Sequence, residues 1–243
     1  MTSITGFIAA VPTANRDAFI HHAELAAEAF LEHGLSAAME GWGEDVPAGE
    51  IISFPKSVLA TPEERIIFSF YRWPDAATQE QGFQAAMADP RIDPVKNPMP
   101  FDGKRVIWGN FEPVLELGAQ QPGGFFDGYV IAIPRDARAA FESFARNCDP
   151  IFMEHGAIWC VETWETMVPE GELTDFRRAV AAKPDEAVVF SWVQWPDRAA
   201  RDAGNARIFA DPRFAAFDCP VDMKRMIYGG FTPVVQAPAS PAA

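Results

Sequence analysis

The chain has 243 residues, of which 49% are hydrophobic and 22% are charged, and its formal net charge is −14. This composition is typical of a globular protein, and the negative charge without clusters of lysine and arginine argues against nucleic-acid binding. No apolar run reaches the roughly 18 residues that a membrane-spanning helix needs. The first residues also lack the pattern of a secretion signal, so we expect a cytoplasmic protein without a membrane partner.

The first half of the chain alternates between strand and helix patterns. In the segment 15–33, apolar residues recur at spacings of four and three and trace one face of a helix. Gly34 then stands where the left-handed end of a helix favours glycine. In chain order the pattern predicts a strand at 4–11, a helix at 15–33, strands at 36–42 and 65–73, a helix at 75–87, and a strand at 104–114 that Pro113 ends.

The second half of the chain repeats the first. Residues 5–91 align with residues 127–213 at an offset of 122, and a later two-residue shortening reduces the offset to 120. A period of this length is too long for a solenoid, so each copy should have its own core. The predicted organisation is a first repeat at 1–117, a linker at 118–124, a second repeat at 125–236 and a disordered tail at 237–243.

Each copy is therefore predicted to be a ferredoxin-like βαββαβ repeat of the α+β class. The strand at 65–73 is apolar on both faces, because Phe68 and Phe70 point one way while Tyr71 and Trp73 point the other. Two helices cover only one face of a four-stranded sheet, so the second apolar face must pack on the other copy. We expect an α/β barrel built within one chain, and hence a monomer with pseudo-dimeric symmetry.

Four segments of the second copy carry a resemblance to a known family. They are TDFRRAV at 174–180, VFSW at 189–192, RDAGNA at 201–206 and KRMIYGGF at 224–231. They resemble the YbaA-like family of uncharacterised bacterial proteins, and the resemblance extends over both copies. It implies the dimeric α/β-barrel fold, with the fusion supplying both protomers, but no reaction, cofactor or catalytic residue. The wider superfamily includes cofactor-independent oxygenases, haem enzymes and isomerases, which is only an analogy of fold.

Four histidines are present. His33 and His155 end the first helix of each copy, and each is a candidate base or ligand at the rim of a pocket. Alternatively, each imidazole interacts with the free carbonyls at the helix end. His21 and His22 have no counterpart in the second copy and are expected on the surface. The second helix of neither copy contains a histidine, which argues against an axial haem ligand.

Glu40 and Glu162 alternate with Trp42 and Trp164 along the second strand of each copy. A carboxylate among aromatic side chains on an apolar face has a raised pKa, which suits it to proton transfer. The two glutamates, together with the two helix-ending histidines, are therefore the candidate catalytic residues.

The same pattern also fits a buried ion pair between these glutamates and Arg105 or Arg225. The two arginines are then either structural or part of a ligand site. Trp73, Trp108, Trp195 and Tyr228, like the two tryptophans named above, could line a site for an aromatic ligand, although large aromatic residues in strands usually belong to the core.

The remaining motifs are uninformative about chemistry. Cys148, Cys160 and Cys219 show no CxxC spacing, and the chain contains no metal-binding or nucleotide-binding motif. We therefore predict no metal and no cofactor.

The leading functional hypothesis is that the protein binds a small apolar or aromatic molecule in a cleft of the barrel. The alternative is a cofactor-independent oxygenase or isomerase that uses a Glu/His pair. The second alternative is a structural interaction module without enzymatic activity.

Overall fold

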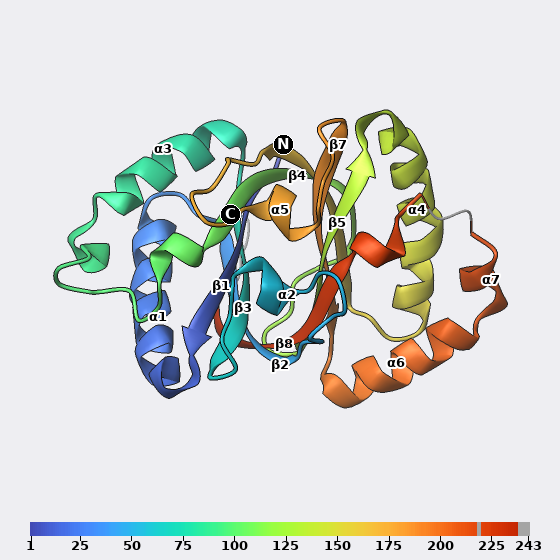
Figure 1. The fold of residues 1–243 in the computed structure, drawn as a ribbon, viewed down its shortest axis with the longest axis horizontal. Helices are drawn as coiled ribbons and strands as arrows, with labels where there is room; N and C mark the ends of the chain where they lie inside the picture. The colour runs from blue at the N-terminus through green and yellow to red at the C-terminus, as the bar shows by residue number, and fades with distance from the viewer. Residues whose placement is uncertain (218–219, 238–243) are drawn as a thin grey trace.

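The computed structural model describes residues 1–217 and 220–237, which form a closed antiparallel barrel of the α+β class (Figure 1). Its strands are β1 (Ser3–Pro12), β2 (Ala37–Asp45), β3 (Glu64–Trp73), β4 (Ile107–Gly118), β5 (Phe125–Pro134), β6 (Trp159–Met167), β7 (Glu186–Trp195) and β8 (Ile227–Ala237). Their order around the barrel is β1-β3-β2-β8-β5-β7-β6-β4. The order within the first copy is β4-β1-β3-β2, and the second copy repeats it as β8-β5-β7-β6.

The last strand of each copy joins the two copies together. Residues 107–111 of β4 pair with β1, and residues 110–118 pair on the other side with β6 of the second copy. In the same way β8 pairs first with β5 and then with β2. The two sheets therefore share both edges, and the barrel has no unpaired strand among the described residues.

Pro113 does not end β4, so the predicted end of this strand is wrong. The strand continues to Gly118, and Pro113 lies opposite Thr163 beside a shift in register that falls between Pro113 and Leu115. A proline lacks the amide proton that a regular ladder needs, but a bulge tolerates it. The shift in register therefore lets β4 run on into the second copy.

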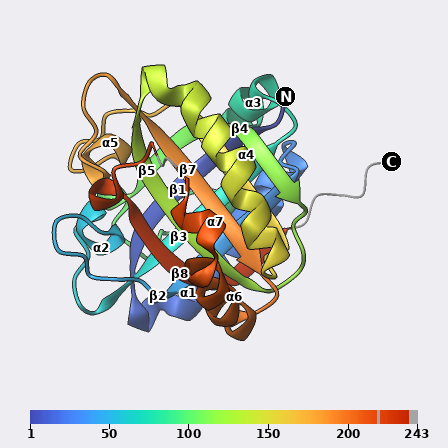
Figure 2. The ribbon, with the colours of Figure 1, turned by 90° about the vertical axis from the view of Figure 1, so that its right-hand side faces the viewer.

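The helices lie outside the barrel, as the sequence predicts, with α1 and α3 on one side and α4 and α6 on the other (Figure 1, Figure 2). The helices are α1 (Arg16–Glu32), α2 (Phe54–Ser57), α3 (Ala76–Met87), α4 (Arg138–Glu154), α5 (Phe176–Ala179), α6 (Arg198–Ala210) and α7 (Pro212–Ala215). Gly34 has the left-handed conformation predicted for the end of α1, with φ at +97°. None of the helices in the described ranges has the length and apolarity needed to cross a bilayer.

The interior of the barrel is a packed aromatic core. The ring of Phe68 stacks on that of Phe190, with centroids 4.5 Å apart and planes 4° apart, and Phe70 stacks on Trp192 at 4.1 Å. Each pair joins one copy to the other. Tyr71 and Trp73 face the helices instead, as the alternation predicts.

The short helices α2 and α5 close one end of this core. They contact each other, and Thr174 beside α5 donates a hydrogen bond to the carbonyl of Ser57. Phe54 of α2 and Phe176 of α5 are both fully buried within the interior cluster. Because neither helix belongs to the sheet, these rings must enter through an open end of the barrel, and they fill it.

Two interior glycines, Gly6 beside Phe190 and Gly128 beside Phe68, make room for the stacked rings. A Cβ atom on Gly128 would lie 2.6 Å from the ring of Phe68. We expect Gly128→Ala to lower the free energy of unfolding by about 1–3 kcal/mol, because overpacking a rigid core forces its side chains out of place. Chemical denaturation measures this loss. In a Phe68→Leu background the same substitution should cost less, and an equal cost in both backgrounds would contradict the steric explanation.

The segment between the copies is held against the barrel. The side chain of Gln194 accepts a hydrogen bond from the amide of Gln121 and donates to the carbonyls of Gln121 and Gly123. Ala237, the first residue of the predicted tail, is buried as the last residue of β8. The rest of that tail lies outside the described residues.

Candidate functional site

Glu40 is a buried carboxyl on the helix-facing side of β2. It is 7% exposed, and it accepts hydrogen bonds from the hydroxyls of Ser69 and Tyr71, the latter at 2.9 Å. Ser69 lies directly opposite Glu40 in the register of β2 and β3, so the strand pairing itself fixes this contact. Burial raises the pKa of Glu40 to about 7, although both hydrogen bonds act in the opposite direction.

Glu40 opens onto a cavity of about 450 Å³ between α1, the outer face of the sheet, α3 and the segment 88–106. The lining is mainly apolar and aromatic. Besides Tyr71, the aromatic side chains that line it are Phe7, Phe19, Phe30, Phe83, Phe101 and Trp108. A mostly apolar cavity of this size with a few polar groups is the usual form of a small-molecule site.

His22 is the imidazole at this cavity, contrary to its predicted place on the surface. It is half-buried on α1, and its Nδ1 lies 3.1 Å from Oδ1 of Asn97. Burial lowers the pKa of His22, so the ring is neutral at pH 7. The sequence signal that could have found it is its place on α1 between the apolar positions Phe19 and Ala26.

The predicted ion pair between Glu40 and Arg105 is wrong. Arg105 lies before β4 and forms an ion pair with Glu64 at 2.6 Å and with Asp102 at 3.1 Å. It also donates to the carbonyl of Leu59, which has a left-handed φ of 52°. Arg105 therefore stabilises the turn at Leu59. Among the interactions described, the side chain of Glu40 has only the hydroxyl groups of Ser69 and Tyr71 as partners.

Arg225 repeats this arrangement in the second copy. It pairs with Glu186 at 2.6 Å and donates to the carbonyl of Ala181, whose φ is 47°. The arginine lowers the pKa of Glu186 to about 2. The alternative ion pair with Glu162 is therefore also wrong, and both arginines pair with a glutamate at the start of the third strand of their copy.

Four of the five tryptophans proposed as ligand contacts do not line this cavity. Trp42 and Trp164 are buried beneath the guanidinium groups of Arg16 and Arg138, at 5.6 and 5.3 Å from the ring centroids. Trp73 and Trp195 are fully buried under the second helix of each copy, where Gly82 and Gly204 leave room for their rings. Trp108 does line the cavity, as the sequence predicts, whereas Tyr228 does not.

His33 and His155 lie at the ends of α1 and α4, as the sequence predicts. Each ring contacts an aspartate instead of backbone carbonyls. Nε2 of His33 lies 3.6 Å from Asp89, and Nε2 of His155 lies 3.2 Å from Asp211. Neither histidine lines the cavity at Glu40, so the structure does not bring the predicted Glu/His pair together there.

The second copy keeps the carboxyl but changes its surroundings. Glu162 accepts a hydrogen bond from Ser191, and burial raises its pKa to about 7. Val193 replaces Tyr71, so the second hydroxyl is lost. The buried Asp149 of α4 lies close enough to Glu162 for the two charges to repel, and its Oδ2 has no hydrogen-bond partner in the described structure.

The space beside α4 is occupied by larger side chains than the space beside α1. Ile131 replaces Ala9, and Cys148 replaces Ala26. Both replacements are buried, and Ile131 belongs to the cluster that also contains Phe141 of α4. The two copies have therefore diverged where the first copy has its cavity.

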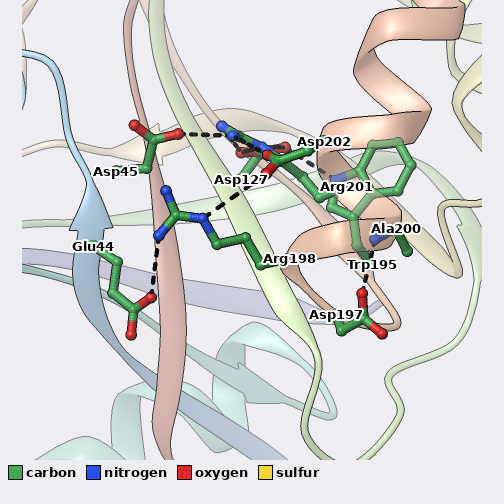
Figure 3. A network of polar contacts seen from close by, with 9 residues as sticks. All are labelled: Glu44, Asp45, Asp127, Trp195, Asp197, Arg198, Ala200, Arg201 and Asp202. Carbon is green, nitrogen blue, oxygen red and sulfur yellow. Dashed lines mark hydrogen bonds and ion pairs between the residues drawn. The ribbon is translucent and has the colours of Figure 1, made fainter.

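A network of charges ties the second copy to the first (Figure 3). Arg201 of α6 forms ion pairs with the buried Asp127 at 2.8 Å and with Asp45 of the first copy at 2.7 Å. Asp127 also accepts a hydrogen bond from the indole of Trp195 at 3.0 Å. Arg198 reaches Glu44 at 3.6 Å beside it. The network is structural and lies away from the cavity at Glu40.

Residues 2–103 and 124–224 each match the model of a family described as "Protein of unknown function (DUF1428)". The chain belongs to the DUF1428 family. It is a tandem duplication of this domain, as the two matches show. The uncharacterised protein YbaA of Escherichia coli strain K12 is 45% identical over 113 residues, which cover 46% of this chain and 97% of YbaA. Among the described residues of both copies, no group of three or more His, Cys, Asp or Glu side chains could hold a metal ion.

Solved structures share the fold of this DUF1428 protein at low identity. A "putative monooxygenase" from Lactobacillus acidophilus has a TM-score of 0.59 at 12% identity, with both chains covered completely. Another from Fusobacterium nucleatum has a TM-score of 0.63 at 9% identity, covering 99% of this chain and 96% of that one. An anthrone oxidase-like protein has a TM-score of 0.54 at 12% identity, covering 99% and 94%. These likenesses show the dimeric α/β-barrel fold alone.

Proposed function

We propose that the first copy binds a small apolar or aromatic molecule in the cavity beside α1, and that Glu40 accepts a proton from this molecule. The observation that carries the proposal is a carboxyl with a pKa of about 7 in the wall of an apolar cavity. A base whose pKa equals the working pH is half ionised and transfers protons efficiently. The cavity itself argues against a purely structural module.

The chemistry follows from the ligand that such a site suits. An apolar molecule with an acidic C–H or O–H group would lose a proton to Glu40 and leave an anion delocalised over its rings. Tyr71 and Ser69 hold the two oxygens of Glu40 and so orient the base. Returning the proton at another carbon is isomerisation, and attack of the anion on O₂ is oxygenation. The names of the fold neighbours support oxygenation, and the proton transfer requires no cofactor.

Anthrone is a suitable probe because its acidic methylene lies between two aromatic rings. With O₂ it gives anthraquinone and water, so oxygen uptake and anthraquinone absorbance report the same reaction. We expect the protein to accelerate it, and Glu40→Gln to lose about 10²-fold or more, as removal of a general base does. Glu162→Gln should retain the activity.

Anaerobic deuterium exchange at the anthrone methylene measures the proton transfer alone. Thermal shifts with anthrone, 1-naphthol and indole measure binding alone. The proposal fails if none of the three compounds stabilises the protein, or if Glu40→Gln exchanges and oxidises anthrone as fast as the unaltered protein does.

The architecture supports further parts of the proposal. The strand order β4-β1-β3-β2 supports a ferredoxin-like repeat in each copy. The proposed boundaries at 1–117 and 125–236 each lie one residue before the end of the last strand of the copy. Closure of the barrel within one chain supports a monomer with pseudo-dimeric symmetry. The cytoplasmic location stays a prediction. Native mass spectrometry of the purified protein would test the monomer and identify any compound that copurifies.

A further inference from the structure

The orientation of Asn97 determines which nitrogen of His22 carries the proton. Nδ2 of Asn97 donates a hydrogen bond to the carbonyl of Arg91 at 2.9 Å. This contact fixes the amide, so the atom that faces His22 is the oxygen Oδ1, which can only accept. Nδ1 of His22 must then be the donor. In a neutral ring, Nε2 is left as a lone-pair acceptor.

We propose that Nε2 of His22 accepts a hydrogen bond from an O–H or N–H group of the bound molecule, and so selects aromatic ligands that carry such a donor. This inference rests on the proposed function and names the substrate class of the same cavity. His22 lines that cavity, and its ring stands edge-on to Phe101 at 6.0 Å. The contact with Asn97 and the ring of Phe101 hold the imidazole, so Nε2 is presented in a fixed position. Asn97 and Phe101 are positioning residues.

The second copy lacks the hydrogen-bonded pair of a histidine and an asparagine. Phe144 stands at the position of His22, and its ring packs edge-on against Phe217 at 6.1 Å. An aromatic pair thus occupies the place of the pair His22–Asn97. Since the same helix position tolerates phenylalanine in the second copy, His22→Phe is a conservative replacement that removes the acceptor.

The first test needs no ligand. With four histidines in the chain, ¹⁵N-edited NMR of the imidazoles can be assigned by single substitutions. We expect His22 to carry its proton on Nδ1 at pH 7, and Asn97→Leu to shift the ring toward the Nε2–H form. A ring protonated on Nε2 in the unaltered protein would overturn the inference and leave the role of Glu40 intact.

The second test compares 1-naphthol with 1-methoxynaphthalene, which has the same rings but no O–H donor. We expect about tenfold tighter binding of 1-naphthol to the unaltered protein, because an unpaired buried acceptor is costly. The ratio should fall to about one in His22→Phe and decrease in Asn97→Leu. His21→Phe, at an exposed neighbour, should keep it.

The variant Glu40→Gln distinguishes the contributions of the two hydrogen-bond acceptors in the cavity, Glu40 and His22, to ligand binding. The preference for 1-naphthol should persist in this variant if His22 causes it. A preference that survives in His22→Phe but is lost in Glu40→Gln overturns the inference while the proposed function stands. If neither naphthalene binds the unaltered protein, both fail.

Discussion

Replacing Glu40 with glutamine should stabilise the protein by about 3 kcal/mol at pH 8 and leave its stability at pH 4 nearly unchanged. The folded carboxyl holds its proton up to a pKa of about 7, whereas the unfolded chain releases it near 4.5. Between these values the native state binds more protons than the unfolded state, so stability falls as pH rises. Glutamine resembles the protonated carboxyl at every pH and removes this loss.

Urea unfolding of the two proteins at half-unit steps from pH 4 to pH 8.5 measures the effect as a difference. Glu64→Gln is the matched control, because Arg105 lowers the pKa of Glu64 to about 2. The ionised Glu64 stabilises the folded protein above pH 4.5, and this stabilisation disappears as the pH falls toward 2. Glu64→Gln should therefore destabilise the protein at pH 8. Parallel pH profiles for Glu40→Gln and the unaltered protein would show that Glu40 titrates normally.

Replacing Arg201 with alanine should destabilise the protein by about 3–5 kcal/mol at pH 8, because it leaves Asp127 buried without its cation. Asp127 is 2% exposed, and burial already raises its pKa. In the variant this carboxyl can escape the penalty only by binding a proton. The loss should therefore be smaller at pH 5 than at pH 8, and thermal unfolding at the two values measures the difference.

The first copy supplies the control for this prediction. Thr5 and Gln79 stand at the positions of Asp127 and Arg201, and Thr5 accepts hydrogen bonds from Trp73 and Gln79. The double variant Asp127→Thr/Arg201→Gln transfers this neutral pair to the second copy. It should lie within about 1 kcal/mol of the unaltered protein, as replacements of whole buried ion pairs commonly do. A double variant as unstable as Arg201→Ala would show that the Asp45 contact carries the energy instead.

The fold could be largely predicted because its signals are local and occur twice. The apolar spacing along α1 recurs in α4, and the glycine that ends each helix has positive φ. The two apolar faces of β3 required a second layer, and the other copy provides it. The course of β4 beyond Pro113 could not be predicted, because a bulge depends on the register of the partner strand β6.

The candidate site was predicted in part. Glu40 was identified from its aromatic neighbours, and its raised pKa has the expected cause. Its partners Ser69 and Tyr71 lie on the adjacent strand, where only the pairing register brings them into reach. The sequence also predicts the wrong partner for Arg105 and the wrong location for His22, because both depend on residues that are distant in sequence. The charge of Arg105 is neutralised by Glu64, and the loop that carries Asn97 covers His22.

The last strand of each copy pairs with a strand of the other copy, and this pairing affects how the chain folds. Ala38 of β2 pairs with Ala237 of β8, so one seam of the barrel joins residues from opposite parts of the chain. Contacts of such long sequence separation form slowly. During synthesis β2 has no partner on this side until residues 227–237 have emerged from the ribosome. An unpaired strand edge is prone to aggregation, so we expect the nascent chain to need protection until this last seam closes.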